Sequence, residues 1–189
     1  MNTKFFLSAF LIGTALFCQA DKLTPASYSF KEKTVVNAAR PDEATDKDFK
    51  KLTDGKYTKE GDRRTAPYVS WRHKDNGRKA PVITFKFASP VNLEEVDIFY
   101  QWGLRSHGIK DIKINAIADD GKKNLIGSIE LNQPFTRPKD TSSIQRAKIK
   151  CTQQIPVSSI EVVFTATGGF LILEEIEFYG KTAAADTKK

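Results

Sequence analysis

From Ala80 onward the chain consists of short segments in which apolar and polar residues alternate, and this pattern excludes most fold classes. Successive side chains of a β-strand point to opposite faces, so each such segment predicts a strand with one buried face. The clearest apolar triplets are Ile83/Phe85/Phe87, Val96/Ile98/Tyr100 and Ile112/Ile114/Ala116. Further strands are expected at residues 27–36, 125–131, 144–151, 160–166 and 171–179.

Turn-forming residues separate these segments, at Ser89-Pro90, Asp119-Asp120-Gly121, residues 134–138 and Gly168-Gly169. Roughly eight strands at this spacing, without an amphipathic helix between them, indicate an all-β antiparallel sandwich and not a parallel α/β sheet. The period of two leaves both a jelly roll and an immunoglobulin-like topology open.

The first 20 residues have the pattern of a secretory signal peptide. Lys4 precedes an apolar stretch at residues 5–17 that is too short to span a membrane as a helix. The small residues Cys18 and Ala20 then predict cleavage after Ala20, which indicates a secreted or periplasmic protein. Two alternatives are acylation of Cys18, which would attach the protein to the cell envelope by a lipid, and retention of the segment as an anchor.

Residues 21–180 are long enough for a single domain, and residues 181–189 lack a hydrophobic pattern and are expected to form a disordered tail. This mature chain contains one cysteine, Cys151, so it forms no internal disulfide. Cys151 follows an alternating segment and is interpreted as a buried small hydrophobic residue, with a reactive thiol as the alternative.

The formal net charge of +7 is compatible with anionic partners such as acidic polysaccharide, lipopolysaccharide, a membrane surface or nucleic acid. The lysines are scattered, which favours solvated strand faces. Export argues against nucleic acid.

Signals of catalysis are weak. The two histidines, His73 and His107, are far apart in sequence, and neither a zinc motif nor a phosphate loop nor a G-x-S-x-G motif occurs. The pairs Glu94/Glu95 and Glu174/Glu175 are adjacent on strands, so their side chains are expected on opposite faces. The chain is therefore interpreted as non-catalytic.

Two motifs about 120 residues apart suggest a particular fold. Lys51-Leu52-Thr53-Asp54-Gly55 contains a turn signal, and residues 174–180 (Glu-Glu-Ile-Glu-Phe-Tyr-Gly) end the pattern of strands. The pair resembles the galactose-binding-like β-sandwiches, which include discoidin domains, coagulation factor five/eight type C domains and related carbohydrate-binding modules. This resemblance implies a jelly roll and a structural calcium ion.

The implied calcium ligands come from both motifs. They are the carboxylates of Asp54 and Glu175 and the backbone carbonyl oxygens of Lys51, Lys56 and Glu174.

At the position where the family has a threonine or serine ligand, this chain has Lys59, and Thr58 or Thr65 would replace it. The alternative is that Asp54 only caps a turn and Glu175 pairs with a nearby lysine or arginine.

The resemblance also implies a carbohydrate site in the loops at one end of the sandwich, where an aromatic ring stacks on the sugar. The candidate ligand-binding residues are Trp102, Arg105, His107, Phe170, His73 and Arg72. Trp71 is expected in the core. The expected partner is a carbohydrate, including acidic polysaccharide.

Two other partners stay open. A module of this fold also serves as a protein-interaction or cell-surface module without a sugar ligand. Membrane binding would need lipidation at Cys18 or insertion of apolar loop tips, for which Trp102, Leu104 and Arg105 are the candidates.

Overall fold

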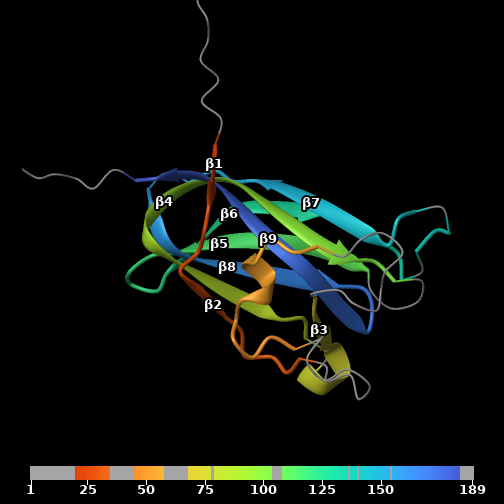
Figure 1. Ribbon diagram of the computed structural model, residues 1–189. Coiled ribbons are helices and arrows are strands. Elements are labelled where there is room, and N and C mark those ends of the chain that lie inside the picture. Colours follow the sequence, from red (N-terminus) through yellow and green to blue (C-terminus); the bar gives the residue numbers. More distant parts are fainter. Residues whose placement is uncertain are drawn as a thin grey trace, which may run out of the picture.

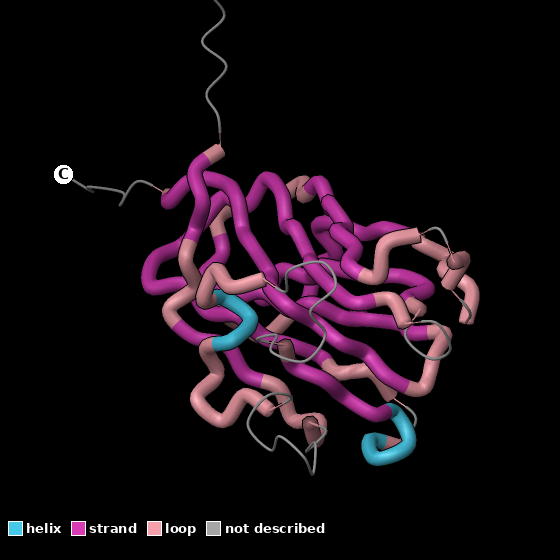
Figure 2. The backbone as a smooth tube through the Cα atoms, turned by 45° about the vertical axis from the view of Figure 1, so that its right-hand side comes forward, coloured by secondary structure: helices cyan, strands magenta, loops and turns pink. Residues whose placement is uncertain are grey.

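The computed structural model describes residues 20–34, 45–57, 68–77, 79–103, 108–135, 137–139, 141–153 and 155–183. Its strands are β1 (Asp21–Leu23), β2 (Ser27–Ser29), β3 (Val69–Arg72), β4 (Val82–Gln101), β5 (Ile109–Ile117), β6 (Lys123–Glu130), β7 (Ile144–Lys150), β8 (Val157–Ala166) and β9 (Phe170–Thr182). Two 3₁₀ turns, η1 (Lys51–Thr53) and η2 (His73–Asn76), are the only helical segments in these ranges, as Figure 2 shows. Within the same ranges, no helix has the length and apolar character needed to cross a membrane.

The strands form an antiparallel two-layer sandwich, and β4 belongs to both layers (Figure 1). The first part of β4 pairs with β2 and β8, and β5 and β6 continue that layer. Beyond a register shift between Lys86 and Val91, β4 pairs instead with β7 and β9. The strands β1 and β3 lie along the other edge of β9. The expected all-β antiparallel sandwich is confirmed.

The three apolar triplets face the interior between the layers, as their alternation predicts. Each of their nine side chains is at most 7% exposed. Phe178 of β9 joins the layers through aromatic contacts, because its ring lies 4.8 Å from the ring of Phe85 and 5.5 Å from that of Phe87. Trp71 is fully buried, which confirms the prediction that it belongs to the core.

Several predicted element boundaries are wrong. Residues 82–101 form one continuous strand that bends, where a turn at Ser89-Pro90 was expected. The strand expected at residues 27–36 is only β2, because the chain leaves the sheet after Ser29 and Thr34 forms an isolated bridge to Trp71. The sequence pattern also missed β1 and β3, which are too short for their alternation to be recognised. At the other end, β9 continues to Thr182, three residues beyond the expected strand of residues 171–179, so the first two residues of the expected disordered tail belong to the sheet.

Two β-bulges orient the outer face of the β7–β4–β9 layer. The first lies between Leu93 and Glu95, where Glu94 is the extra residue on β4. The second lies opposite Phe99 and Tyr100, where Glu174 is the extra residue on β9. At each place two glutamates stand between inward-facing apolar residues, and a bulge accommodates the extra residue. The expectation that Glu94 and Glu95 lie on opposite faces is therefore wrong, because both line the outer face. Glu175 consequently lies opposite Phe99 and shares the outer face with it.

The close packing of β9 on β4 can be tested by substitution of Gly180. A Cβ atom at this position would lie 2.1 Å from the carbonyl oxygen of Asn92. We expect Gly180→Ala to destabilise the fold by about 1–3 kcal/mol, because the backbone of β4 must shift to admit the methyl group. Gly169→Ala is the matched control, since a Cβ at Gly169 meets nothing within 4 Å. Equal melting temperatures for the two variants would contradict this packing.

Candidate functional site

The turn that carries Asp54 is anchored to the core by a buried hydrogen-bond network. The Asp46 carboxylate accepts hydrogen bonds from the backbone N–H groups of Lys50 (3.0 Å) and Lys51 (3.3 Å), and from the hydroxyl of Tyr28. The same hydroxyl accepts the Leu52 N–H at 3.0 Å. Burial, reinforced by the hydrogen bond to Asp46, raises the pKa of Tyr28. These bonds hold η1 in place and therefore determine where the chain continues into Asp54.

Asp54 caps its own turn. Its Oδ1 atom accepts the Lys56 N–H at 3.0 Å, and its Oδ2 atom lies 3.4 Å from the Lys56 ammonium. Gly55 adopts a φ of 72°, a left-handed conformation that glycine adopts without strain. From this position the Gly55 N–H donates a hydrogen bond to the side chain of Glu175. The two sequence motifs are therefore brought into contact.

Glu175 is a buried carboxyl group that forms no ion pair within the described part of the chain. It is 1% exposed, and its Oε2 atom has no hydrogen-bond partner among the described residues. Burial raises the pKa of Glu175 to about 8. The hydrogen bond from Gly55 lowers this pKa, but the negative charge of Asp54 raises it further. None of the described lysines and arginines forms an ion pair with Glu175, although Lys22 is close enough to lower its pKa slightly.

Part of the donor set that calcium prefers is present at this place. Calcium binds carboxylate and carbonyl oxygens, and the carboxyl groups of Asp54 and Glu175 lie beside an exposed turn. The unpartnered Oε2 atom of Glu175 fits a cation. The Glu174 side chain is occupied by a 2.8 Å hydrogen bond from Gln101, and Thr58 and Thr65 lie outside the described residues. In the described ranges, no group of three or more His, Cys, Asp or Glu side chains is arranged to hold a metal.

The neighbouring carboxyl group of Glu177 is stabilised in its charged form. It accepts hydrogen bonds from Lys22 (2.5 Å), Tyr179 (2.7 Å) and Tyr57. Burial alone would raise the pKa of Glu177, but these three donors outweigh it and lower the pKa. The contrast with Glu175, two residues away on the same face, shows that the donors around each carboxyl group set its charge.

A third buried acidic side chain on this face, that of Asp97, forms an ion pair with Arg146 of β7. The Arg146 guanidinium also lies 5.3 Å from the centroid of the Phe99 ring. Sequence reasoning missed Asp97, Glu177 and Arg146. The available signal was the spacing of two residues between Glu95 and Asp97 and between Glu175 and Glu177, which places each pair on one face of its strand.

At the loop end of the sandwich, Trp102 does not form the exposed aromatic surface that was expected. It is 7% exposed, and its indole N–H donates to the carbonyl oxygen of Pro134 at 3.2 Å. Its backbone N–H donates to the carbonyl oxygen of Ser143. The segment between β6 and β7 therefore binds both the indole N–H and the backbone N–H of Trp102. The expectation failed because the pattern around Trp102 did not show that this segment would cover it. Arg105 and His107 lie outside the described residues.

Arg72, His73 and Phe170 come together at the same end. Arg72 lies opposite Phe170 in the β3–β9 pairing, and its guanidinium carbon is 6.0 Å from the centroid of the Phe170 ring. The Arg72 Nε–H group donates a hydrogen bond of 2.7 Å to the Asp75 carboxylate. The His73 backbone N–H donates to the carbonyl oxygen of Gly169. The His73 ring is buried, which lowers its pKa despite a hydrogen bond to the backbone of Gly168.

Cys151 is half-buried against the core, and burial raises the pKa of its thiol to about 12. A thiol with this pKa is protonated at neutral pH, so the interpretation as a packing residue is favoured over the reactive thiol.

The raised pKa of Glu175 predicts a pH dependence of stability. The native state keeps a proton on Glu175 between about pH 5 and pH 8, whereas the unfolded chain releases it. The free energy of unfolding should therefore fall as pH rises through this window, by at most about 1.4 kcal/mol per pH unit. Glu175→Gln should remove this contribution, and the exposed Glu94→Gln should not. Parallel stability curves for wild type and Glu175→Gln, measured by chemical denaturation, would contradict the assignment.

Comparison with known proteins identifies the fold. No protein-family model and no curated protein sequence matches this chain. Its structure is similar to the C-terminal domain of a chitobiase from Bacteroides fragilis, with 16% identity, a TM-score of 0.54 and coverage of 87% of this chain and 100% of that one. It is also similar to a structure of the CBM32-1, CBM32-2 and M60 catalytic domains of ZmpB from Clostridium perfringens, with 16% identity, a TM-score of 0.52 and coverage of 85% and 15%. Together with the antiparallel two-layer topology, these similarities show that the chain has the galactose-binding-like β-sandwich fold.

Proposed function

We propose that this protein is an exported, non-catalytic module that binds carbohydrate at the loop end of the sandwich. Support comes from the fold, which it shares with a structure containing CBM32 modules. The observation that carries the proposal is the pairing of Phe170 with Arg72 beside the turn at Gly168-Gly169. An aromatic ring can pack on the apolar face of a sugar while a fixed hydrogen-bond donor beside it binds the hydroxyl groups.

Each residue at this end has a distinct task in the proposed site. The half-buried Phe170 ring packs against the apolar face of the sugar. The Arg72 guanidinium is oriented by Asp75 through its Nε atom, and its terminal N–H groups bind hydroxyl oxygens. His73 is a positioning residue, because its backbone N–H binds Gly169 and holds the adjacent turn. Trp102 holds the segment between β6 and β7 through its hydrogen bonds to Pro134 and Ser143. Arg105 and His107 are further proposed ligand-binding residues.

Substitution of the two central residues tests this site. Phe170→Ala and Arg72→Ala should each weaken binding to a sugar selected from a glycan array by about tenfold, with little change in melting temperature. Leu125→Ala, which truncates an exposed residue on β6, is the control and should bind normally. Trp102→Ala should instead lower the melting temperature, since it removes a buried side chain. Unchanged affinity in both Phe170→Ala and Arg72→Ala, or a blank array, would refute the loop-end site.

We further propose that Asp54 and Glu175 hold a structural calcium ion, with the carbonyl oxygens of Lys51, Lys56 and Glu174 as further ligands. Bound calcium would keep Glu175 ionised. The pH experiment described for Glu175 therefore has a second arm, in which millimolar calcium should abolish the pH dependence of wild-type stability and raise the melting temperature. Magnesium, which prefers a smaller octahedral site, is the control. An equal response of Glu175→Gln to calcium would contradict this site.

Export by cleavage after Ala20 agrees with the position of the first strand. The strand β1 begins at Asp21, which pairs directly with Gly180, so cleavage would leave every described strand intact. N-terminal sequencing of the exported protein should begin at Asp21. An acylated Cys18 would mean a lipid anchor instead, and an intact Met1 would exclude both forms of processing.

A further inference from the structure

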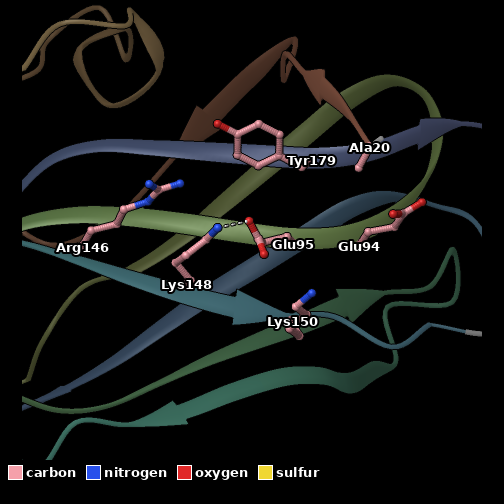
Figure 3. A pocket seen from close by; sticks show the side chains of 7 residues that line it. All are labelled: Ala20, Glu94, Glu95, Arg146, Lys148, Lys150 and Tyr179. Carbon is pink, nitrogen blue, oxygen red and sulfur yellow. Dashed lines mark ion pairs between the residues drawn. The ribbon is translucent and has the colours of Figure 1, made fainter. Parts of the chain in front are cut away.

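A second concave surface lies on the outer face of the layer formed by β7, β4 and β9. It is a shallow pocket of about 410 Å³, lined by Glu94, Glu95, Arg146, Lys148, Lys150 and Tyr179 (Figure 3). Ala20 also borders it, and the proposed cleavage would remove that residue. Tyr179 is nine residues along β9 from Phe170, which corresponds to roughly 30 Å of extended strand. The pocket is therefore separate from the loop-end site.

Three cations line one side of this pocket in a row. Arg146, Lys148 and Lys150 alternate along β7 with the buried Ala147 and Ile149, so all three side chains project from the same outer face. Successive members are separated by about 6.6 Å along the strand. Figure 3 shows the row running along β7, with Glu95 and Glu94 of β4 beside it. A row of this kind matches a ligand whose negative groups are also spaced along a chain.

The members of the row differ in how firmly they are held. Arg146 is fixed by the buried Asp97 and by the Phe99 ring, yet its side chain remains 45% exposed. Because a guanidinium has five N–H donors, donors remain for a ligand. Lys148 is held by Glu95 at 2.9 Å. Lys150 forms no ion pair with any described residue. One end of the row is therefore preorganised and the other end is free to adjust.

The two glutamates in the lining narrow the class of ligand. Glu94 and Glu95 repel any anionic group, so they disfavour a densely charged nucleic acid most and tolerate a polymer whose charges are separated by hydroxyl groups, from which they accept hydrogen bonds. The lining also offers no large aliphatic side chain for insertion into a lipid bilayer. Cations and hydroxyl acceptors side by side suit a molecule that carries both anionic groups and hydroxyl groups.

We propose that this outer face binds an anionic polysaccharide, with its carboxylate or sulfate groups on Arg146, Lys148 and Lys150 and its hydroxyl groups on Glu94 and Glu95. The proposal rests on the carbohydrate-binding function for its ligand class, but the site is independent of the loop end. The Tyr179 ring borders the sugar backbone. The two sites together would let one domain contact a sugar at the loop end and a charged chain on its face.

Affinity electrophoresis through gels containing polygalacturonate, dextran sulfate or neutral dextran tests the face directly. Lys148→Gln/Lys150→Gln should weaken binding to at least one of the two polyanions by about tenfold and leave the melting temperature unchanged. The matched control is Lys86→Gln/Lys113→Gln, which removes two exposed lysines from the outer face of the other layer. Polygalacturonate carries carboxylate groups and dextran sulfate carries sulfate groups, so the polymer that binds wild type more tightly identifies the preferred group.

Three results would overturn the proposal: equal weakening in both double variants, equal binding to neutral dextran, or no binding to either polyanion. Phe170→Ala separates this site from the loop end, because it should leave polyanion binding unchanged. Loss of sugar binding in Phe170→Ala with intact polyanion binding would support two sites. The opposite pattern, a blank glycan array with polyanion binding that depends on Lys148 and Lys150, would refute the loop-end site alone.

Discussion

The structure depends on the participation of β4 in both layers of the sandwich. Its inward side chains, from Ile83 to Tyr100, face the same interior on both sides of the bend near Pro90. Ladder pairing is interrupted between Lys86 and Val91, but the same strand pairs with β8 before the bend and with β7 and β9 after it, so β4 links the two layers covalently. The long strand β9 lies beside the second part of β4 and contributes Phe178 to the shared aromatic cluster. The places of the loop-end site and of the outer-face pocket follow from this arrangement, because the loop end begins where β4 ends and the outer face is formed by β4 with its neighbours β7 and β9.

The outer face of the β7–β4–β9 layer is unusual because it buries carboxyl groups on the solvent side of a sheet. Glu175, Glu177 and Asp97 are each at most 7% exposed there. Each has a different electrostatic environment: Asp97 has an arginine, Glu177 has three hydrogen-bond donors, and Glu175 has one backbone N–H. Burial without a partner is costly for a charge, so a poorly compensated carboxyl group favours either protonation or a bound cation.

The sequence predicted the layers better than it predicted the surface. Alternation identified the inward residues of β4 and β5 because burial of one strand face imposes a period of two. The motif around Asp54 and that around Glu175 correctly indicated two segments that meet. Ser89-Pro90 predicts a turn because it is a common turn signal, and the sequence does not show that one strand continues on both sides of it. The burial of Trp102 was also unpredictable, since a segment some 30 residues away covers it.

By itself, the sequence determined that this chain forms an antiparallel sandwich and which side chains enter its core, because strand periodicity is a local property. Only the tertiary structure decided which polar side chains share a surface. The row Arg146, Lys148 and Lys150 faces Glu95 because β7 pairs with β4, and Arg72 meets Phe170 because β3 pairs with β9. Such pairings join residues that are distant in the chain, and their register depends on the turns, bulges and core contacts of the whole domain.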